Sequence, residues 1–147
     1  MIRIIKCAFL FIVIIILSSS SKAEGQAFIN VKSYGAVADG KTYDTDSIQK
    51  AIDETAKNGG GTIYFPAGNY LTRTIVLKDN ISLFLDNGCT ILGSTDLNKF
   101  DPKFGSFFDS DGRKIGTALV FAKNCKNISI EGNGTINGQG YEKFLQF

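Results

Sequence analysis

Two closely spaced carboxylates, Asp44 and Asp46, are the first side chains in the sequence that could perform acid–base chemistry. A positioned carboxyl group can give or take a proton during a reaction. Both residues, however, stand at the start of an amphipathic helical pattern. Asp is favoured as a helix cap, and a carboxylate in the first turn interacts favourably with the helix dipole. We therefore assign Asp44 and Asp46 to the start of a helix and not to catalysis.

A second acidic stretch, residues 109–112 (Asp-Ser-Asp-Gly), is similar to the beginning of a calcium-binding loop. It lacks the third ligand and the distal Glu that such a loop needs. The sequence also contains no histidine. We therefore assign no metal ligand, no cofactor-binding residue and no catalytic residue.

Four phenylalanines lie among acidic residues and glycines in residues 99–114, at Phe100, Phe104, Phe107 and Phe108. In a saccharide-binding protein such aromatic side chains could stack on sugar rings. The alternative is a long loop that its phenylalanines anchor to the rest of the protein. We favour the second interpretation.

The first 23 residues have the pattern of a secretory leader. Arg3 and Lys6 precede an uncharged apolar run of 11 residues at positions 7–17, and the small residues Ser21 and Ala23 suit a cleavage site. A membrane anchor is the alternative, but about 20 apolar residues are needed to cross a bilayer. We expect a leader at residues 1–23 and a secreted or periplasmic mature chain.

The mature chain is nearly neutral. Without Arg3, Lys6 and Lys22, 13 of the 16 basic residues remain against 14 acidic ones, which does not suit a nucleic-acid-binding protein. An extracellular location permits a disulfide between Cys89 and Cys125. Each cysteine, however, takes the place of a small residue beside a strand-like run. We expect two separate, half-buried thiols.

One helix is predicted, at residues 44–57. Apolar residues recur there at the spacing of a single helix face, at Ile48, Ala51, Ile52 and Thr55. Three glycines follow at residues 59–61. Gly59 suits the left-handed position just past a helix end, where a side chain would be strained.

The rest of the chain alternates short strand-like runs with Gly and Asn turns. These runs lie at residues 27–31, 62–65, 74–77, 81–85, 90–92, 118–121, 128–130 and 135–136. Residues 79–83 match residues 126–130 at an offset of 47, and self-similarity at a fixed spacing is typical of a solenoid. We interpret the offset as two turns of a parallel β-helix, each of somewhat over twenty residues. An antiparallel sandwich is the alternative.

Several blocks are similar to known enzymes. Residues 30–36, 39–45, 48–53 and 59–71 resemble the N-terminal entry of the pectate-lyase-like β-helix superfamily. Residues 77–94 and residues 127–140, which end in Gly-Thr-Ile-Asn-Gly-Gln-Gly, resemble glycoside hydrolase family 28, the polygalacturonases. Together the similar blocks extend from residue 28 to residue 140.

The resemblance implies an all-β fold: a right-handed parallel β-helix over residues 24–147, capped at its N-terminal end by the helix of residues 44–57 and incomplete at its C-terminal end. It also implies inverting hydrolysis of galacturonosyl bonds in pectic polysaccharide. The family resemblance implies a monomer, no nucleic-acid partner and no stable membrane span after cleavage of the leader.

The catalytic motifs of that family are not in this sequence, which has no Asn-Thr-Asp, no adjacent Asp pair and no His. Asn137 stands where Asp is usual, and residues 141–144 where a Trp is often seen. We expect the N-terminal portion of a longer enzyme, inactive by itself. Two alternatives stay open: a non-catalytic carbohydrate-binding or surface β-helix protein, and a lyase or epimerase of the same superfamily.

Overall fold

The computed structural model describes residues 27–139, apart from residues 102, 105, 106, 109, 113 and 117. The expected leader at residues 1–23 and the C-terminal residues 140–147 lie outside this range. The elements are, in chain order, β1 (Ala27–Asn30), a 3₁₀ helix (Val31–Tyr34), β2 (Asp39–Tyr43), α2 (Thr45–Lys57), β3 (Gly61–Phe65), β4 (Gly68–Thr72), β5 (Ile75–Val76), β6 (Ile81–Leu85), β7 (Cys89–Gly93), a second 3₁₀ helix (Leu97–Lys99), β8 (Phe107–Phe108), β9 (Lys114–Gly116), β10 (Val120–Phe121), β11 (Ser129–Gly132) and β12 (Thr135–Asn137).

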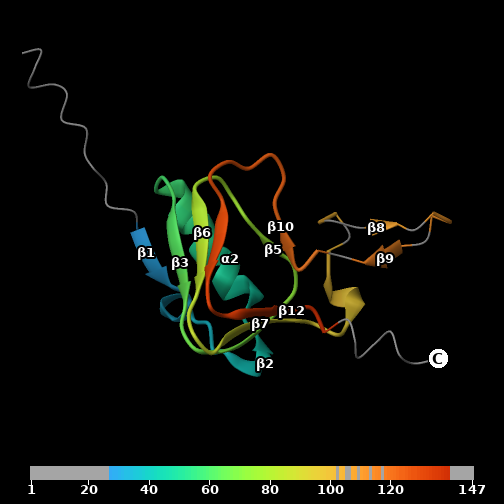
Figure 1. Ribbon diagram of the computed structural model, residues 1–147, viewed down its shortest axis with the longest axis horizontal. Helices are drawn as coiled ribbons and strands as arrows, with labels where there is room; N and C mark the ends of the chain where they lie inside the picture. The colour runs from blue at the N-terminus through green and yellow to red at the C-terminus, as the bar shows by residue number, and fades with distance from the viewer. Residues whose placement is uncertain are drawn as a thin grey trace, which may run out of the picture.

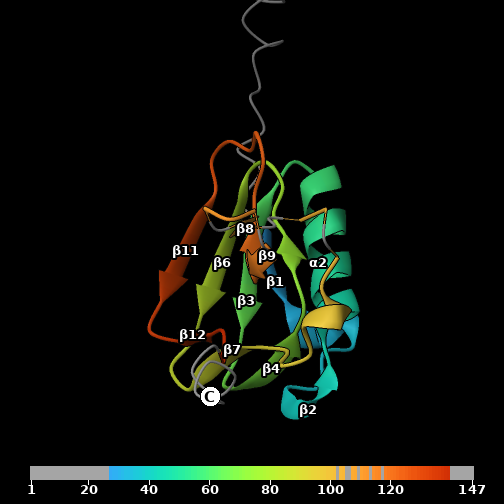
Figure 2. The ribbon, with the colours of Figure 1, turned by 90° about the vertical axis from the view of Figure 1, so that its right-hand side faces the viewer.

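The strands form three parallel sheets and one antiparallel pair. The first sheet has the order β1-β3-β6-β11, the second β12-β7-β4-β2 and the third β10-β5. Every pairing within these three sheets is parallel, and only β8 and β9 pair antiparallel. Figure 2 shows the strands of the first sheet side by side, with α2 standing next to β1. The antiparallel sandwich is therefore wrong, and the predicted parallel arrangement is confirmed.

The chain visits the three sheets in turn. After β3 in the first sheet come β4 in the second and β5 in the third, and β6 then returns to the first (Figure 1). Side chains alternate between buried and partly exposed along β3, β6 and β7. Successive side chains of a strand point to opposite faces of the sheet. Every second side chain of each strand therefore points into one shared hydrophobic core. The largest members of that core include Phe65, Tyr70 and Ile91.

Helix α2 confirms the predicted helix to within one residue, and its apolar face at Ile48, Ala51, Ile52 and Thr55 is buried. At its end, Gly60 N donates to Thr55 O at 3.0 Å and Gly59 N donates to Ala56 O at 3.2 Å. These two bonds are the Schellman arrangement, which requires a positive φ at the residue after the helix. Gly59 has φ +100°, as its position in the sequence predicts.

Two strands of the second sheet, β2 and β4, are not predicted from the sequence. Both belong to stretches rich in Gly, Asn and Asp, which resemble turns more than strands. Parallel pairing with neighbours overrides that local preference, since Asn69 of β4 is the register partner of Thr90 in β7 and of Asp39 in β2. The predicted opening strand is one residue too long, because Val31 begins a 3₁₀ helix.

The interpretation of the 47-residue repeat is wrong in one respect. Ser129 of β11 is the direct register partner of Ser82 in β6, so an offset of 47 is one circuit of the three sheets and not two. The preceding circuit is short, because Gly61 of β3 pairs with Ile81. The long circuit contains the segment between β7 and β10, including the β8–β9 hairpin, which Figure 1 shows projecting from the body. A sequence offset alone cannot separate one extended circuit from two short ones.

Matched turn residues stack at the ends of these circuits. Asn127 Nδ2 donates to Asn80 Oδ1 at 2.8 Å, and Ser129 Oγ donates to Ser82 Oγ at 2.7 Å. Asn80 and Asn127 both have positive φ, at 61° and 53°. Asn tolerates this conformation better than most residues, so the predicted turn role of both asparagines is confirmed.

Among the described residues, β11 and β12 stand at the edges of their sheets. Three isoleucines are exposed there: Ile128 (38%) just before β11, Ile130 (45%) in β11 and Ile136 (42%) in β12. An apolar sheet edge with unpaired backbone groups is a template for association. We expect the purified chain to bind a hydrophobic dye and to self-associate, and Ile130→Thr with Ile136→Thr to reduce both effects. Dye fluorescence and sedimentation velocity measure them. A monomer that takes up no dye before substitution would contradict this expectation.

Candidate functional site

The Asp44 carboxylate is a structural group. Asp44 stands at the N-cap position of α2, as predicted, but its side chain makes no hydrogen bond to the helix. It accepts instead from the backbone N–H groups of Val37 at 2.6 Å and Ala38 at 3.0 Å, and it is 1% exposed. The prediction of a side-chain cap is therefore wrong, because both carboxylate oxygens are bound to backbone N–H groups of the preceding loop. A carboxylate held in this way is not available to a substrate.

Asp46, the second candidate, points outward from the first turn of α2. Its side chain is 93% exposed and pairs with Arg73, at 3.1 Å between Oδ1 and Nη2. Asp44 and Asp46 thus have different partners and different exposures. They do not form a paired acid–base site, which agrees with the assignment from sequence.

Two further carboxylates are held in their ionised form. Hydrogen bonds from the backbone N–H groups of Thr42 and Lys41 lower the pKa of Asp39. The Tyr64 hydroxyl donates to Asp86, and this bond lowers the pKa of the Asp86 carboxyl. A general acid must be protonated at its working pH. Asp39 and Asp86 are therefore unsuited to that role.

Neither cysteine is half of a disulfide, and Cys89 is unsuited to act as a nucleophile. Cys89 and Cys125 are both free, as expected, but Cys89 is fully buried and not half-buried. Burial raises the pKa of the Cys89 thiol to about 11, which disfavours the reactive thiolate. Among the described residues no group of His, Cys, Asp and Glu side chains is placed to hold a metal ion. The similarity of residues 109–112 to a calcium loop involves residue 109, which lies outside the described residues.

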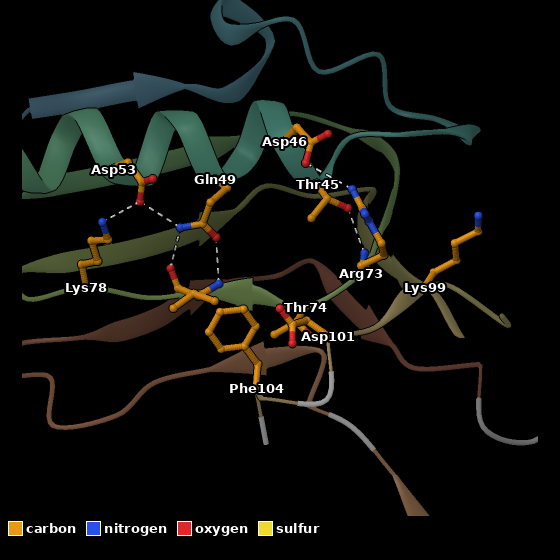
Figure 3. Close-up of a pocket in the computed structure, with 11 residues that line it drawn as sticks. Thr45, Asp46, Gln49, Asp53, Arg73, Thr74, Lys78, Lys99, Asp101 and Phe104 are labelled. Atoms are coloured by element: carbon orange, nitrogen blue, oxygen red, sulfur yellow. Dashed lines mark hydrogen bonds and ion pairs between the residues drawn. The ribbon is translucent and has the colours of Figure 1, made fainter. Parts of the chain in front are cut away.

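An open pocket of about 390 Å³ lies between α2, β5 with its flanking residues, and residues 97–104 (Figure 3). Three cations and three carboxylates are among its lining side chains. The lining residues are Thr45, Asp46, Gln49, Asp53, Arg73, Thr74, Val76, Lys78, Lys99, Asp101 and Phe104. We therefore take this pocket as the candidate site in the part of the chain that the structure describes.

One end of this pocket is saturated by the protein itself. The Gln49 side chain accepts from Val76 N at 2.9 Å and donates to Val76 O at 3.0 Å, as a neighbouring strand would. Gln49 also donates to Asp53 Oδ1, and Lys78 Nζ lies 2.9 Å from the same oxygen. Partial burial acts to raise the pKa of Asp53, but the bonds from Lys78 and Gln49 outweigh it and the pKa is lowered. At this end Gln49 binds Val76 and Asp53, and Lys78 binds Asp53, so these contacts join α2 to β5.

The other end, near Thr45 and Asp46, is only partly saturated. Arg73 bonds to Asp46 through Nη2 alone, and its Nε is buried without an acceptor. Its guanidinium lies 5.6 Å from the Tyr43 ring, which fixes its plane. Lys99 is exposed and has no ion pair among the described residues. The arrangement offers unused cationic donors to a ligand.

Phe104 forms an apolar wall of the pocket and packs against Phe121, at 5.7 Å between ring centroids. Phe100 is buried. These two phenylalanines therefore anchor their segment, as the sequence favours, while Phe104 also faces the pocket. The segment is not a simple loop, because β8 and β9 pair within it.

The pocket is not predicted from the sequence. Its lining residues come from three segments that are far apart in the chain. The one available signal is the polar stripe on α2, where Asp46, Gln49 and Asp53 recur at the spacing of one helix face. That stripe is equally typical of a solvent-exposed helix face. No helix among the described residues has the length and apolar character needed to span a membrane.

Known proteins with a similar sequence include polygalacturonases, mannuronan C5-epimerases and a plasmin- and fibronectin-binding protein. The chain is 35% identical over 116 residues to a Vitis vinifera protein named "Probable polygalacturonase", covering 73% of this chain and 23% of that protein. It is 36% identical over 122 residues to an exo-poly-alpha-D-galacturonosidase of Dickeya chrysanthemi, a match that covers 78% of this chain and 20% of that protein. It is also 37% identical over 117 residues to plasmin and fibronectin-binding protein A of Streptococcus pneumoniae, covering 76% and 16%.

Solved structures of similar fold are parallel β-helix proteins. An exopolygalacturonase of Thermotoga maritima matches with a TM-score of 0.66 at 33% identity, covering 76% of this chain and 25% of that one. A family 28 exopolygalacturonase of Yersinia enterocolitica matches with a TM-score of 0.64 at 29% identity, and the match covers 77% of this chain and 21% of that one. The A-module of the Azotobacter vinelandii mannuronan C-5 epimerase AlgE6 matches with 0.57 at 28% identity, covering 75% and 28%.

The chain spans about a fifth of the length of these curated relatives. Residues 28–145 match the family described as "Rhamnogalacturonase A/epimerase, pectate lyase-like". This match covers most of the sequence, and it agrees with the parallel sheets and with the polygalacturonase relatives. The chain therefore belongs to the rhamnogalacturonase A/epimerase, pectate-lyase-like family, as a polygalacturonase-like member of its superfamily.

Proposed function

We propose that the chain is the N-terminal portion of a secreted glycoside hydrolase that cleaves galacturonosyl linkages of pectic polysaccharide. The observation that carries this proposal is the identity of 35–36% to a polygalacturonase-named protein and to an exo-poly-alpha-D-galacturonosidase, over about three quarters of the chain. In this proposal residues 1–23 are the secretory leader, residues 24–147 belong to the β-helix domain, and the whole protein acts as a monomer.

The proposed architecture is a right-handed parallel β-helix with α2 closing its N-terminal end. Two observations support α2 as the closing element. Its face at Ile48, Ala51 and Ile52 is fully buried. Its Gln49 side chain pairs with the backbone of Val76 on the side of β5 opposite β10. A β-helix needs such a cover at its end, because the first strands otherwise expose unpaired edges and apolar residues.

The proposed mechanism is inverting acid–base catalysis by carboxyl groups that lie in the later part of the protein. Inversion needs two carboxyl groups far enough apart to admit a water molecule between one of them and the sugar. The environments of Asp39, Asp44, Asp53 and Asp86 support this placement, since each of these carboxylates is already bound to protein donors. The contribution of this portion is to support the coils that follow it.

The purified chain is expected to release no reducing ends from polygalacturonate, because its sequence has no adjacent Asp pair and no His, and Asp44 and Asp46 do not form a paired acid–base site. A reducing-sugar assay at several pH values measures this. The full gene product, assayed beside it, is expected to be active and to invert the anomeric configuration, which NMR of the first product reports. Hydrolysis by the chain alone would contradict the proposed position of the catalytic groups.

Two specific observations favour other functions for the whole protein. Identity of 37% to plasmin and fibronectin-binding protein A supports a non-catalytic surface protein. The fold match to the mannuronan C-5 epimerase module supports an epimerase or lyase. The full gene product separates the three: hydrolysis gives reducing ends, a lyase gives unsaturated ends that absorb in the ultraviolet, and epimerisation of mannuronan changes its NMR spectrum without cleavage. A product with none of these activities would favour the surface protein.

A further inference from the structure

We propose that the partly saturated end of the pocket between α2 and residues 97–104 binds one uronic-acid residue of an acidic polysaccharide. This inference rests on the proposed function for the class of polymer, and on the pocket for the contacts. Two of the lining carboxylates, Asp46 and Asp53, are paired with the cations Arg73 and Lys78. The site is therefore a binding site, and no chemical step is assigned to it.

The charges of the pocket leave one cation uncompensated. Arg73 pairs with Asp46 at 3.1 Å and Lys78 pairs with Asp53 at 2.9 Å. The third lining carboxylate, Asp101, pairs at 2.7 Å with Lys103, which is not a lining residue. Once these pairs are made, Lys99 is the lining cation without an ion pair among the described residues. A ligand with a single negative charge neutralises it.

Arg73 adds a second group of donors at the same end. A guanidinium has five N–H donors. Nη2 of Arg73 bonds to Asp46 and Nε is buried, so a ligand reaches this side chain, which is 34% exposed, through its Nη groups only. Its partner Asp46 is 93% exposed, and so exposed an ion pair contributes little stability. A ligand carboxylate can therefore share Arg73 with Asp46 at small cost. In Figure 3 Arg73 and Lys99 both stand toward the Thr45–Asp46 end of the view.

The size and the remaining walls suit a sugar ring better than a small inorganic anion. The volume of about 390 Å³ falls in the range of roughly 300–1,000 Å³ that is usual for organic ligands. Phe104 adds apolar ring atoms to the wall, and the Lys103 ammonium lies 5.0 Å from its ring centroid. Asp46 Oδ2 and Thr74 Oγ1 remain able to accept hydrogen bonds from sugar hydroxyls. A carboxylate, hydroxyls and an apolar ring face occur together in a uronic acid.

The test is a titration of the ¹⁵N-labelled chain with trigalacturonate, followed by NMR at low salt. We expect saturable shifts of the amides of Arg73, Thr74 and Lys99. Ile130→Thr and Ile136→Thr are added if self-association broadens the spectrum, since both are uncharged and outside the pocket. Because Lys99 is exposed, its ion pair with a ligand carboxylate is worth at most about fivefold in affinity at low salt, so Lys99→Ala should weaken binding about two- to fivefold. Lys99→Arg should keep most of the affinity.

The matched control is Lys32→Ala, an exposed lysine on the first 3₁₀ helix that does not line the pocket, and it should leave the affinity unchanged. Neutral galactotriose and inorganic phosphate are the comparison ligands. The proposal is overturned if the pocket amides do not respond to trigalacturonate, if either comparison ligand binds as well, or if Lys32→Ala weakens binding as much as Lys99→Ala.

A fourth ligand, trimannuronate, allows the uronate site in the pocket and the proposed hydrolysis of galacturonan to be tested independently of each other. If trimannuronate binds the pocket more tightly than trigalacturonate and Lys99→Ala abolishes the difference, the uronate site is supported while the galacturonan substrate loses support. If trigalacturonate fails at the pocket while the full gene product still hydrolyses polygalacturonate, the site is wrong and the proposed function stands.

Discussion

Replacing Gly60 by alanine is expected to lower the free energy of unfolding by about 3 kcal/mol or more. Gly60 has φ +108°, a conformation that L-residues rarely adopt. A Cβ at this position would lie 2.3 Å from the Cβ of Asn80 and 2.4 Å from its backbone oxygen. Left-handed strain costs roughly 1–2 kcal/mol and overpacking roughly another 1–3. Chemical denaturation followed by circular dichroism measures the loss.

A displacement of Asn80 by a side chain at residue 60 would also disturb the first sheet. Asn80 O accepts from Gly61 N at 2.9 Å, and this bond starts the pairing of β3 with β6. Gly88→Ala is the matched control, because Gly88 also has positive φ (+74°) but its added Cβ would meet only the Ala67 Cβ at 3.4 Å. It should cost about 1 kcal/mol, from strain alone. Equal losses at the two glycines would show that the approach of Asn80 to Gly60 is not tight.

Replacing Asp44 by alanine is expected to cost about 3 kcal/mol. The Asp44 carboxylate is buried and accepts two backbone hydrogen bonds, from Val37 and Ala38. Each hydrogen bond to a charged acceptor contributes about 1.5–3 kcal/mol, and the donors left behind have no other partner in the loop. Asp46→Ala is the control of the same type two residues away, and it should change stability by less than about 1 kcal/mol because its ion pair is exposed.

Denaturant midpoints of the two Asp variants, with the slope of the transition checked for constancy, give both values. Asp44→Asn refines the result. An amide oxygen can accept one of the two bonds, while the amide NH₂ faces the other donor, so this variant should fall between the wild type and Asp44→Ala. An Asp44→Ala protein as stable as the wild type would show that the loop of Val37 and Ala38 is held by other contacts.

Much of the fold follows from the sequence because its signals are local. The apolar face of α2 and the positive φ of Gly59 are fixed by helix periodicity and by the absence of a side chain at Gly59. The strands β3, β6 and β7 carry their own alternation of buried residues. By contrast β2 and β4 begin with Asp-Gly and Gly-Asn, which are typical of turns, and the pairing with parallel neighbours makes these residues part of strands.

The pocket could not be predicted for a related reason. Gln49 reaches Val76 across 27 residues, and Lys99 and Phe104 come from a segment that the sequence presents as a loop. Contacts of this kind depend on which segments the completed circuits bring together. The buried role of Asp44 was hidden in the same way, since its two donors belong to the preceding loop and not to the helix that its position suggests.

The unequal circuits have a consequence for the order in which the chain folds. The pairing of β3 with β6 joins residues 20 positions apart, whereas the pairing of β6 with β11 joins residues 47 apart. The entropy lost on closing a loop grows with the logarithm of its length, which makes the long closure costlier by about 0.8 kcal/mol. The short circuit also places Ile63, Phe65, Leu83 and Ile91 together. Folding is therefore expected to nucleate at β3–β7. Strands β10, β11 and β12 are expected to pair with that nucleus later, after the long loop that contains β8 and β9 has closed.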